Sequence, residues 1–339
     1  MLSEQLGFPI VSARGCHDDH PAWLVRMKRL GVLVAILLSA TAVSCDLFSD
    51  DNDDLSLGEP IPGTEQHVEG DDDTPVLQFN AYPRISPDGK TLAYRWFDGT
   101  LGGSIYLRDL ASSEVRFLVQ GIQFDWSPDS RWLVFASSGH NLGKITREGD
   151  SLFQLTHGGG RLDPSWSPDG GTIAHYVETG DEHTAGIATV TSDGEVGPRL
   201  FLGGMPDWFP DGRLFASLGR IDAFLVYDWP TARLDTITGI PDQVRGPQVS
   251  LDGKRITFWA RGIWICNSDG SGLRLIIRDD ASKWGRGDNP EFRVGAPSWH
   301  PDGRHIIFEH LRIAETTYRA VGRVVAGSYS IRMVDVGAP

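Results

Sequence analysis

The chain has 339 residues, of which 40% are hydrophobic and 22% charged, a composition that supports a packed core and excludes a wholly disordered protein. The formal net charge of −14 argues against a nucleic-acid binder, because phosphates would find no neutralising surface. The 3 cysteines are too few for a disulfide scaffold or a cysteine-rich metal site.

A targeting signal begins at Met27, which we expect to be the true start, so that residues 1–26 are a non-native extension. Basic residues follow Met27, residues 30–38 form an apolar run, and small residues lead to Cys45. This pattern is typical of a secretory signal, and the run is too short for a membrane span. Residues 27–44 followed by a cysteine resemble a bacterial lipoprotein signal. The resemblance implies cleavage before Cys45 and acylation of that residue; the alternative is an ordinary signal with an incidental cysteine.

Residues 45–74 are predicted to form a disordered, flexible acidic tether. Positions 46–73 hold 11 acidic residues and no Lys or Arg. One sign of charge and low hydrophobicity keep such a segment solvated and extended. Carboxylates could also hold calcium, but the EF-hand spacing with its central glycine is absent, which favours the tether.

One motif recurs six times in residues 75–339 and organises them as a single domain. Each copy is a variant of Trp-Ser-Pro-Asp-Gly, a turn in which proline presets the first corner, aspartate can bond to its own backbone and glycine supplies positive φ. β-rich runs follow each turn, and the copies are spaced by 40 to 50 residues. This period predicts an all-β fold, a six-bladed β-propeller of four-stranded antiparallel blades. The motif aspartates, which we assign to turn structure, are Asp88, Asp129, Asp169, Asp211, Asp252 and Asp302.

The last repeat lacks a fourth strand, because the chain ends after the run Ser330–Val336. An unassigned β-type segment, Pro75–Asn80, precedes the first repeat. We expect this segment to pair with Ser330–Val336, which would complete blade six and leave no open sheet edge.

These repeats closely resemble the TolB-like propeller family, whose WD40-like repeats carry a Pro-x-Trp-Ser-Pro-Asp-Gly signature. The proline position holds proline in every copy but one, where Phe124 stands instead. The resemblance covers about residues 75–336 and implies the fold, but the fold hosts binding proteins, peptidase side domains and a few enzymes. TolB itself has a separate domain before its propeller, whereas only the tether lies between Cys45 and Pro75 here. The motif prolines are Pro83, Pro164, Pro206, Pro247 and Pro297.

The sequence contains no Gly-x-Ser-x-Gly elbow, no His-Glu-x-x-His motif and no phosphate-binding Gly-rich loop. We therefore predict that the protein is not an enzyme and uses no cofactor or metal. Cys266 is expected to be a buried, inert thiol, and His183 and His310 to be exposed or locally bonded. The alternative is a lactonase- or lyase-type enzyme with a metal in the central channel. The nearest candidate ligands from first strands are Asp125, Asp163 and Asp207.

Loop lengths indicate a binding face. In a propeller, the connections from strand two to three and from strand four to one emerge on one face, and long loops on a rigid scaffold often carry contacts. The long segments here all belong to this class: Asp98–Gly103, Gly180–Ala185, Asp279–Gly295 and Arg312–Gly327. Two of them lie in adjacent blades and hold Trp, Tyr and Arg, the common interface anchors, although loop-on-loop packing would use the same residues. The predicted partner-binding residues are Trp284, Arg286, Phe292, Arg293, Tyr318 and Arg319.

The sequence thus predicts a monomeric lipoprotein of the bacterial cell envelope, periplasmic or surface-exposed, that touches the membrane only through its lipid anchor. Its expected role is to bind a protein, a peptide or an envelope polymer through the loop-rich face.

Overall fold

The computed structural model describes residues 59–60, 66–71, 82–96, 103–179, 185–218, 223–278, 292–319 and 322–337. They all belong to one unit, Asn52–Pro339, and the signal segment with Cys45 lies outside the described part. The described residues form strands and turns, and among them there is no helix of the length and apolarity that a membrane span requires.

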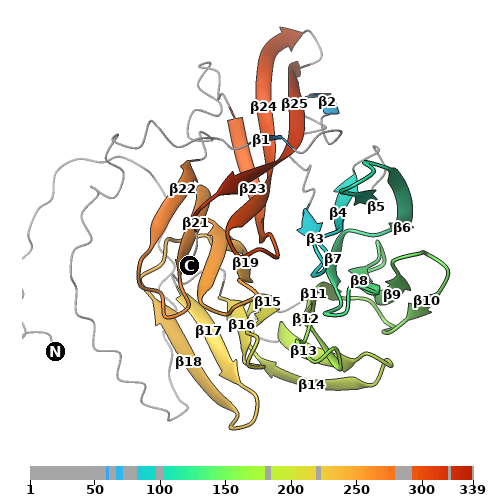
Figure 1. Ribbon diagram of the computed structural model, residues 1–339, viewed down its shortest axis with the longest axis vertical. Helices are drawn as coiled ribbons and strands as arrows, with labels where there is room; N and C mark the ends of the chain where they lie inside the picture. The colour runs from blue at the N-terminus through green and yellow to red at the C-terminus, as the bar shows by residue number, and fades with distance from the viewer. Residues whose placement is uncertain are drawn as a thin grey trace, which may run out of the picture. The chain divides into compact units, whose positions relative to one another are not determined.

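Six antiparallel sheets follow one another along the chain and surround a central axis (Figure 1). In each of the first five, four consecutive strands pair in chain order. The first strands of blades two to six contact one another in succession, and that of blade six contacts that of blade one. The predicted six-bladed propeller of four-stranded blades is confirmed.

Blade one comprises β3 (Arg84–Ile85), β4 (Thr91–Trp96), β5 (Ser104–Asp109) and β6 (Val115–Gln120). Blade two comprises β7 (Gln123–Trp126), β8 (Trp132–Ala136), β9 (Leu142–Thr146) and β10 (Leu152–Gln154). Blade three comprises β11 (Arg161–Trp166), β12 (Thr172–Val177), β13 (Gly186–Thr191) and β14 (Val196–Phe201). Blade four comprises β15 (Gly204–Trp208), β16 (Leu214–Ser217), β17 (Ala223–Asp228) and β18 (Arg233–Thr238). Blade five comprises β19 (Arg245–Val249), β20 (Arg255–Trp259), β21 (Gly262–Asn267) and β22 (Arg274–Arg278).

The Ser-Pro-Asp-Gly turns join strands one and two of the blades. In blade one, Ser86 Oγ donates to Asp88 Oδ1 at 2.6 Å and accepts from the Thr91 N–H at 3.0 Å, while Gly89 has a φ of +73°. The same 2.6 Å contact between serine and aspartate recurs in blades two, three and five. The repeated aspartates therefore organise the turns.

The motif prolines shape the first strands. In the five blades that carry this proline, the residue before it has a φ between +41° and +53°. In blades three to six the strand register also shifts at this point, which marks a β-bulge, whereas blade two has Phe124 and an uninterrupted register. Proline cannot donate to the ladder, and a bulge changes the direction of the side chains that follow it. The proline and the bulge together determine in which direction the side chain of the next residue points.

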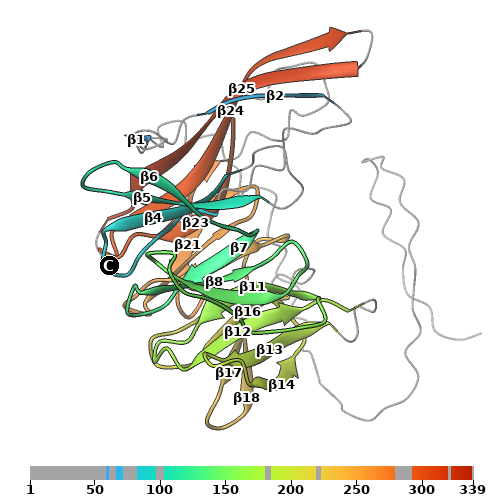
Figure 2. The same ribbon diagram turned by 90° about the vertical axis from the view of Figure 1, so that its right-hand side faces the viewer.

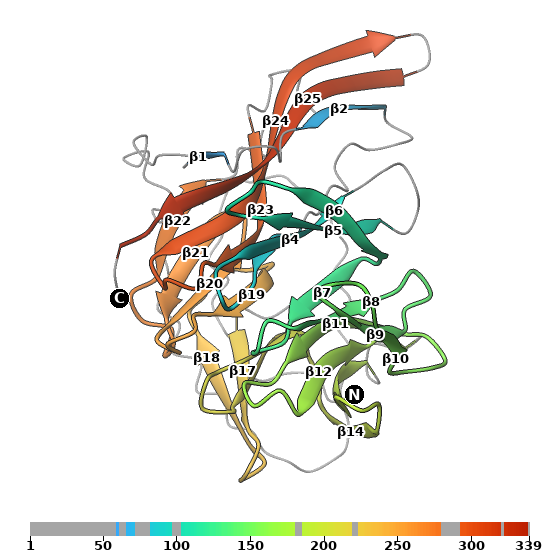
Figure 3. The same cartoon turned by 45° about the vertical axis from the view of Figure 1, so that its right-hand side comes forward.

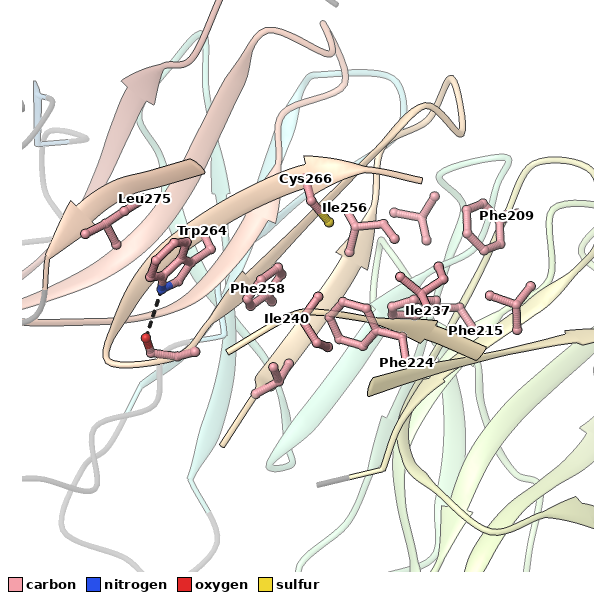
Figure 4. Close-up of a cluster of buried hydrophobic side chains, with 14 residues drawn as sticks. Phe209, Phe215, Phe224, Ile237, Ile240, Ile256, Phe258, Trp264, Cys266 and Leu275 are labelled. Atoms are coloured by element: carbon pink, nitrogen blue, oxygen red, sulfur yellow. Dashed lines mark hydrogen bonds between the residues drawn. The ribbon is translucent and has the colours of Figure 1, made fainter. Parts of the chain in front are cut away.

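Apolar side chains fill the spaces between neighbouring blades. One cluster joins blades four and five and includes the fully buried Phe215, Phe224 and Phe258 (Figure 4). The ring centroids are 4.6 Å apart for the first pair and 5.3 Å apart for the second. Trp264 in the same cluster donates through Nε1 to the Ala260 carbonyl at 2.9 Å. Each such aromatic side chain contributes roughly 1.5–3 kcal/mol through burial, so the blades form a rigid scaffold.

A long hairpin extends blade six beyond the other blades (Figures 2 and 3). Blade six begins with β23 (Phe292–Trp299), and β24 (His305–Arg319) then pairs with β25 (Gly322–Asp335) along their whole length. The prediction that Arg312–Gly327 is a loop is therefore wrong. Both sides of the hairpin are rich in Ile, Thr and Val, residue types that favour strands.

An N-terminal segment completes blade six, but it is not the predicted one. β1 (Glu59–Pro60) pairs with Arg332–Met333 of β25, and β2 (Gln66–Asp71) pairs with the hairpin extension of the same strand. Pro75–Asn80, the predicted closing strand, lies outside the described residues. The prediction that residues 45–74 are disordered throughout is wrong at β1 and β2, which form strands. Proline without an N–H suits the outer edge of a sheet, which is the position of Pro60.

Candidate functional site

A ring of polar residues surrounds the central channel. Each blade contributes the residue between its motif proline and the tryptophan position, and five of the six residues line a cavity of about 270 Å³. The sixth, Ser165, donates from its hydroxyl to a ring carboxylate at 3.2 Å. The ring comprises Arg84, Asp125, Ser165, Asp207, Gln248 and Ser298.

The cavity lies at the end of the channel that carries the strand-one-to-two turns, the end opposite to the long loops. Prolines of five turns line it, and Leu251 takes the place of the sixth proline with 56% of its surface exposed. Four motif tryptophans also line the cavity but are only 4–8% exposed. The site is therefore a small pit with an apolar rim, which we call the channel mouth. The five prolines are Pro87, Pro128, Pro168, Pro210 and Pro301.

Arg84 reaches across the ring from blade one to blade five. With the Gln248 amide oriented so that its Nε2 donates to Ser298 Oγ at 2.9 Å, its Oε1 accepts from Arg84 Nε at 2.9 Å. Arg84 Nη1 donates to the Pro83 carbonyl at 3.2 Å. Because blades one and five are not neighbours in the ring, the guanidinium bridges the channel and forms part of the floor of the pit.

Two ring carboxylates join successive blades. Asp125 Oδ2 in blade two accepts from the Trp166 N–H in blade three at 2.8 Å. Asp207 Oδ2 in blade four accepts from the Val249 N–H in blade five at 2.7 Å, and its Oδ1 accepts from Ser165 Oγ at 3.2 Å. The ring thus has an architectural role as well as lining the pit.

Burial and neighbouring charges shift the pKa values of the charged ring residues and of Asp163 close to them. Burial, and then the charge of Asp125, raise the pKa of Asp207 to about 7. Burial raises the pKa of Asp163 to about 6, although Arg84 opposes the shift. Burial also raises the pKa of Asp125 and lowers that of Arg84. A protonated Asp207 has a partner for its proton, because the Ser165 hydroxyl can accept as well as donate.

The carboxylates proposed for a channel metal do gather near the axis, but the arrangement does not fit a metal. Arg84 lies close enough to interact with the charges of Asp125, Asp163 and Asp207, and it supplies the positive charge that a cation would bring. Two of the three carboxylates already accept main-chain hydrogen bonds that hold the blades together. A metal ion here would lie beside the Arg84 guanidinium, and the repulsion between the two positive charges opposes its binding.

The predicted partner-binding residues do not form one patch in the described part. Trp284 and Arg286 lie outside it. Phe292 and Arg293 begin β23, where they pair with Arg312 and Leu311. Tyr318 and Arg319 pair with Arg323 and Gly322 at the far end of the hairpin. At about 3.3 Å per strand residue, roughly 20 Å of hairpin separates the two pairs.

The other singled-out residues have structural surroundings or lie outside the described part. Cys266 is a free, buried thiol, and burial followed by the charge of Asp269 raises its pKa to about 12. His310 is buried in β24, so of its two predicted states the exposed one is wrong and the locally bonded one stays open, and His183 falls outside the described residues.

The polar ring as a whole and the exposed Leu251 were not predicted from the sequence, although two ring members, Asp125 and Asp207, were named as candidates. A signal for the ring was present, because the residue between the motif proline and the tryptophan position is polar in all six copies although its neighbours are apolar. Leu251 stands where the other five turns have proline, and the sequence alone does not show that this leucine is exposed at the end of the channel.

Comparisons with known proteins support the fold. No family model matches the chain. The uncharacterized protein Atu1656 of Agrobacterium fabrum is 27% identical over 213 residues, which cover 55% of this chain and 69% of that protein.

Two solved structures share the propeller. TolB from Acinetobacter baumannii has a TM-score of 0.54 and 13% identity, and the match covers 72% of this chain. This chain spans only 65% of the length of that protein. A TolB candidate from Agrobacterium tumefaciens has a TM-score of 0.52 and 19% identity, and the match covers 71% of this chain and 88% of that one. The chain thus has a TolB-like six-bladed propeller fold.

Proposed function

We propose that this protein is a non-catalytic, lipid-anchored binding protein of the bacterial cell envelope, which takes a protein or peptide partner at the channel mouth. The observation that carries the proposal is the pit of about 270 Å³ with its rim of prolines and the exposed Leu251. Apolar side chains exposed around a concavity are typical of interaction sites. The resemblance of residues 27–44, followed by Cys45, to a lipoprotein signal supports the envelope location.

The chemistry of the pit favours a peptide over an envelope polymer. Sugars commonly stack on exposed aromatic faces, but the tryptophans of the pit are buried within its walls. A small apolar side chain of a partner would instead find an apolar rim and the N–H donors of the Arg84 guanidinium, which also lines the pit. These donors could bind a carbonyl or carboxylate oxygen of the same partner segment.

The floor of the pit supports binding rather than catalysis. Asp125 and Asp207 hold neighbouring blades together through main-chain hydrogen bonds, so moving them would disturb the ring. The competing proposal is a propeller enzyme that uses Asp207, since a carboxyl with a pKa of about 7 can exchange protons near neutrality. Substrate turnover that is lost in Asp207→Asn while partner capture is kept would favour the enzyme.

The test of binding uses Leu251→Arg. The native side chain is exposed, so the substitution should leave the melting temperature unchanged, while a bulky charge at the rim should weaken partner capture from native membranes more than about tenfold. The matched control is Leu152→Arg on the outer strand β10, where the native leucine is 60% exposed. Equal capture by wild type and Leu251→Arg would refute the proposed site.

A further inference from the structure

The turn in blade six differs chemically from the other turns. Where blades one, two, three and five have the serine that contacts the turn aspartate, blade six has His300. Where blades one and three begin strand two with threonine, blade six has His305. Asp302 lies between the two histidines in sequence. The three side chains form a group of two imidazoles and one carboxylate.

The potential ligand atoms of this group already converge. His305 Nδ1 lies 2.6 Å from Asp302 Oδ2, and His300 Nδ1 lies 3.1 Å from the same oxygen. One ligand atom from each of the three residues can be chosen so that all lie within 4.8 Å of one another. Ligands at 2.0–2.2 Å from a shared zinc ion would be separated by roughly 3–4 Å, so only small rotations are needed.

The backbone holds the carboxylate in this orientation. Asp302 Oδ1 accepts from the N–H groups of Arg304 at 2.8 Å and His305 at 3.0 Å, which leaves Oδ2 directed at the imidazoles. The carboxylate is thus a fixed anionic ligand, as outer contacts make it in many metal sites. All three residues are partly exposed, so an ion can reach them.

We propose that His300, Asp302 and His305 bind one divalent transition-metal ion, with Zn²⁺ as the best match. Two imidazole nitrogens and one carboxylate oxygen suit Zn²⁺, whereas Ca²⁺ and Mg²⁺ prefer sites made of oxygen ligands. The ion replaces the proton that His305 Nδ1 and Asp302 Oδ2 share, and it displaces the weak 3.1 Å hydrogen bond from the Asp302 N–H to His300 Nδ1. Three protein ligands leave at least one coordination position for water or a partner.

The position of this site connects it with the channel mouth. Pro301, between His300 and Asp302, is one of the prolines that line the pit. A metal ion would place a positive charge with an open coordination position beside the apolar rim. The inference does not depend on the proposed partner binding, because the metal is tested alone.

The test titrates ZnCl₂ into the metal-stripped full chain, prepared without a histidine tag, in competition with a chromophoric zinc indicator. The variant His300→Ser with His305→Thr converts the blade-six turn into the kind found in blades one and three, where serine contacts the aspartate at 2.6 Å, so folding should be kept. The control is His140→Ser. His140 contacts Glu178 at 3.2 Å but belongs to no three-ligand group among the described residues.

We expect the double variant either to bind one Zn²⁺ ion fewer than wild type or to bind the same number with one ion held more than about tenfold more weakly. The control should match wild type in both stoichiometry and affinity. Zn²⁺ should also raise the melting temperature of wild type and of the control, but not that of the double variant. His17 and His20 near the N-terminus are present in wild type and in both variants. Any zinc that they bind is therefore the same in all three proteins and does not affect the comparison. Equal stoichiometry and affinity in wild type and the double variant, or an equal loss in the control, would overturn the proposal.

Discussion

Asp207→Asn tests whether the channel ring holds a carboxyl that the fold prefers to keep protonated. In the structure Asp207 Oδ2 accepts from the Val249 N–H and Oδ1 contacts Ser165 Oγ. An asparagine can reproduce both contacts, because its oxygen accepts from Val249 and its NH₂ group donates to the serine hydroxyl. The substitution therefore removes the charge while it keeps the link between blades four and five.

The magnitude follows from proton linkage. The pKa of Asp207 is about 7 in the folded protein, against about 3.9 for an unperturbed aspartate. The folded state thus keeps a proton that the unfolded state releases. The stability contributed by this group is fully present below about pH 4 and is lost as the pH rises through about 7. Wild type should lose roughly 2.5 kcal/mol of unfolding free energy between pH 5 and pH 8 that Asp207→Asn does not lose.

The assay is urea unfolding of both proteins at several pH values between 5 and 8. The unfolding free energy of Asp207→Asn minus that of wild type should rise with pH over this range. Asp169→Asn is the control, because the hydrogen bond from Ser167 lowers the pKa of Asp169 and its titration lies below the range. The unfolding free energy of Asp169→Asn minus that of wild type should stay constant over this pH range. A constant or falling difference for Asp207→Asn would refute the assignment of a protonated carboxyl in the ring.

Three further predictions concern other parts of the chain. Cys45→Ser should abolish acylation and leave either an uncleaved precursor or released soluble protein; unchanged mass and membrane fractionation would contradict the lipoprotein assignment. Deletion of residues 46–60 removes β1 and should lower the melting temperature by at least about 2 °C relative to deletion of 46–58, because it exposes the edge of β25; equal values would show that β1 does not close blade six. Cys266, buried and with a pKa of about 12, should resist alkylation until the protein unfolds, and rapid labelling of the native chain would show that the site opens.

The repeat motif made the fold predictable because it encodes turns whose chemistry is local. Serine, aspartate and glycine of one turn contact one another within a few residues, so six copies in phase indicate six blades. The closing strand was not predictable in the same way. Glu59 and Pro60 carry no β-type pattern, and their strand exists only through its pairing with Arg332–Met333. Such long-range pairing leaves no periodic signal in a two-residue strand.

The channel mouth could be predicted only in part. The polar position next to the motif proline repeats in every copy, and bulges lie at that proline in blades three to six. The spacing of the repeats does not predict in which direction such a bulge turns the side chain that follows it. The contact between Arg84 and Gln248 crosses the ring between non-adjacent blades, and repeat spacing alone does not predict it. The hairpin of blade six was predicted as a loop because the other blades end their second strands near the position of Leu311.

The most direct test of partner binding at the channel mouth is photo-crosslinking in intact envelopes. A photoreactive amino acid replaces Leu251 at the rim, Tyr318 near the tip of the hairpin, or Leu152 on the outer strand of blade two. We predict a discrete crosslinked partner from position 251 and none from position 152 or 318. A crosslinked partner from position 318 together with none from position 251 would contradict the account and place the binding surface on the hairpin.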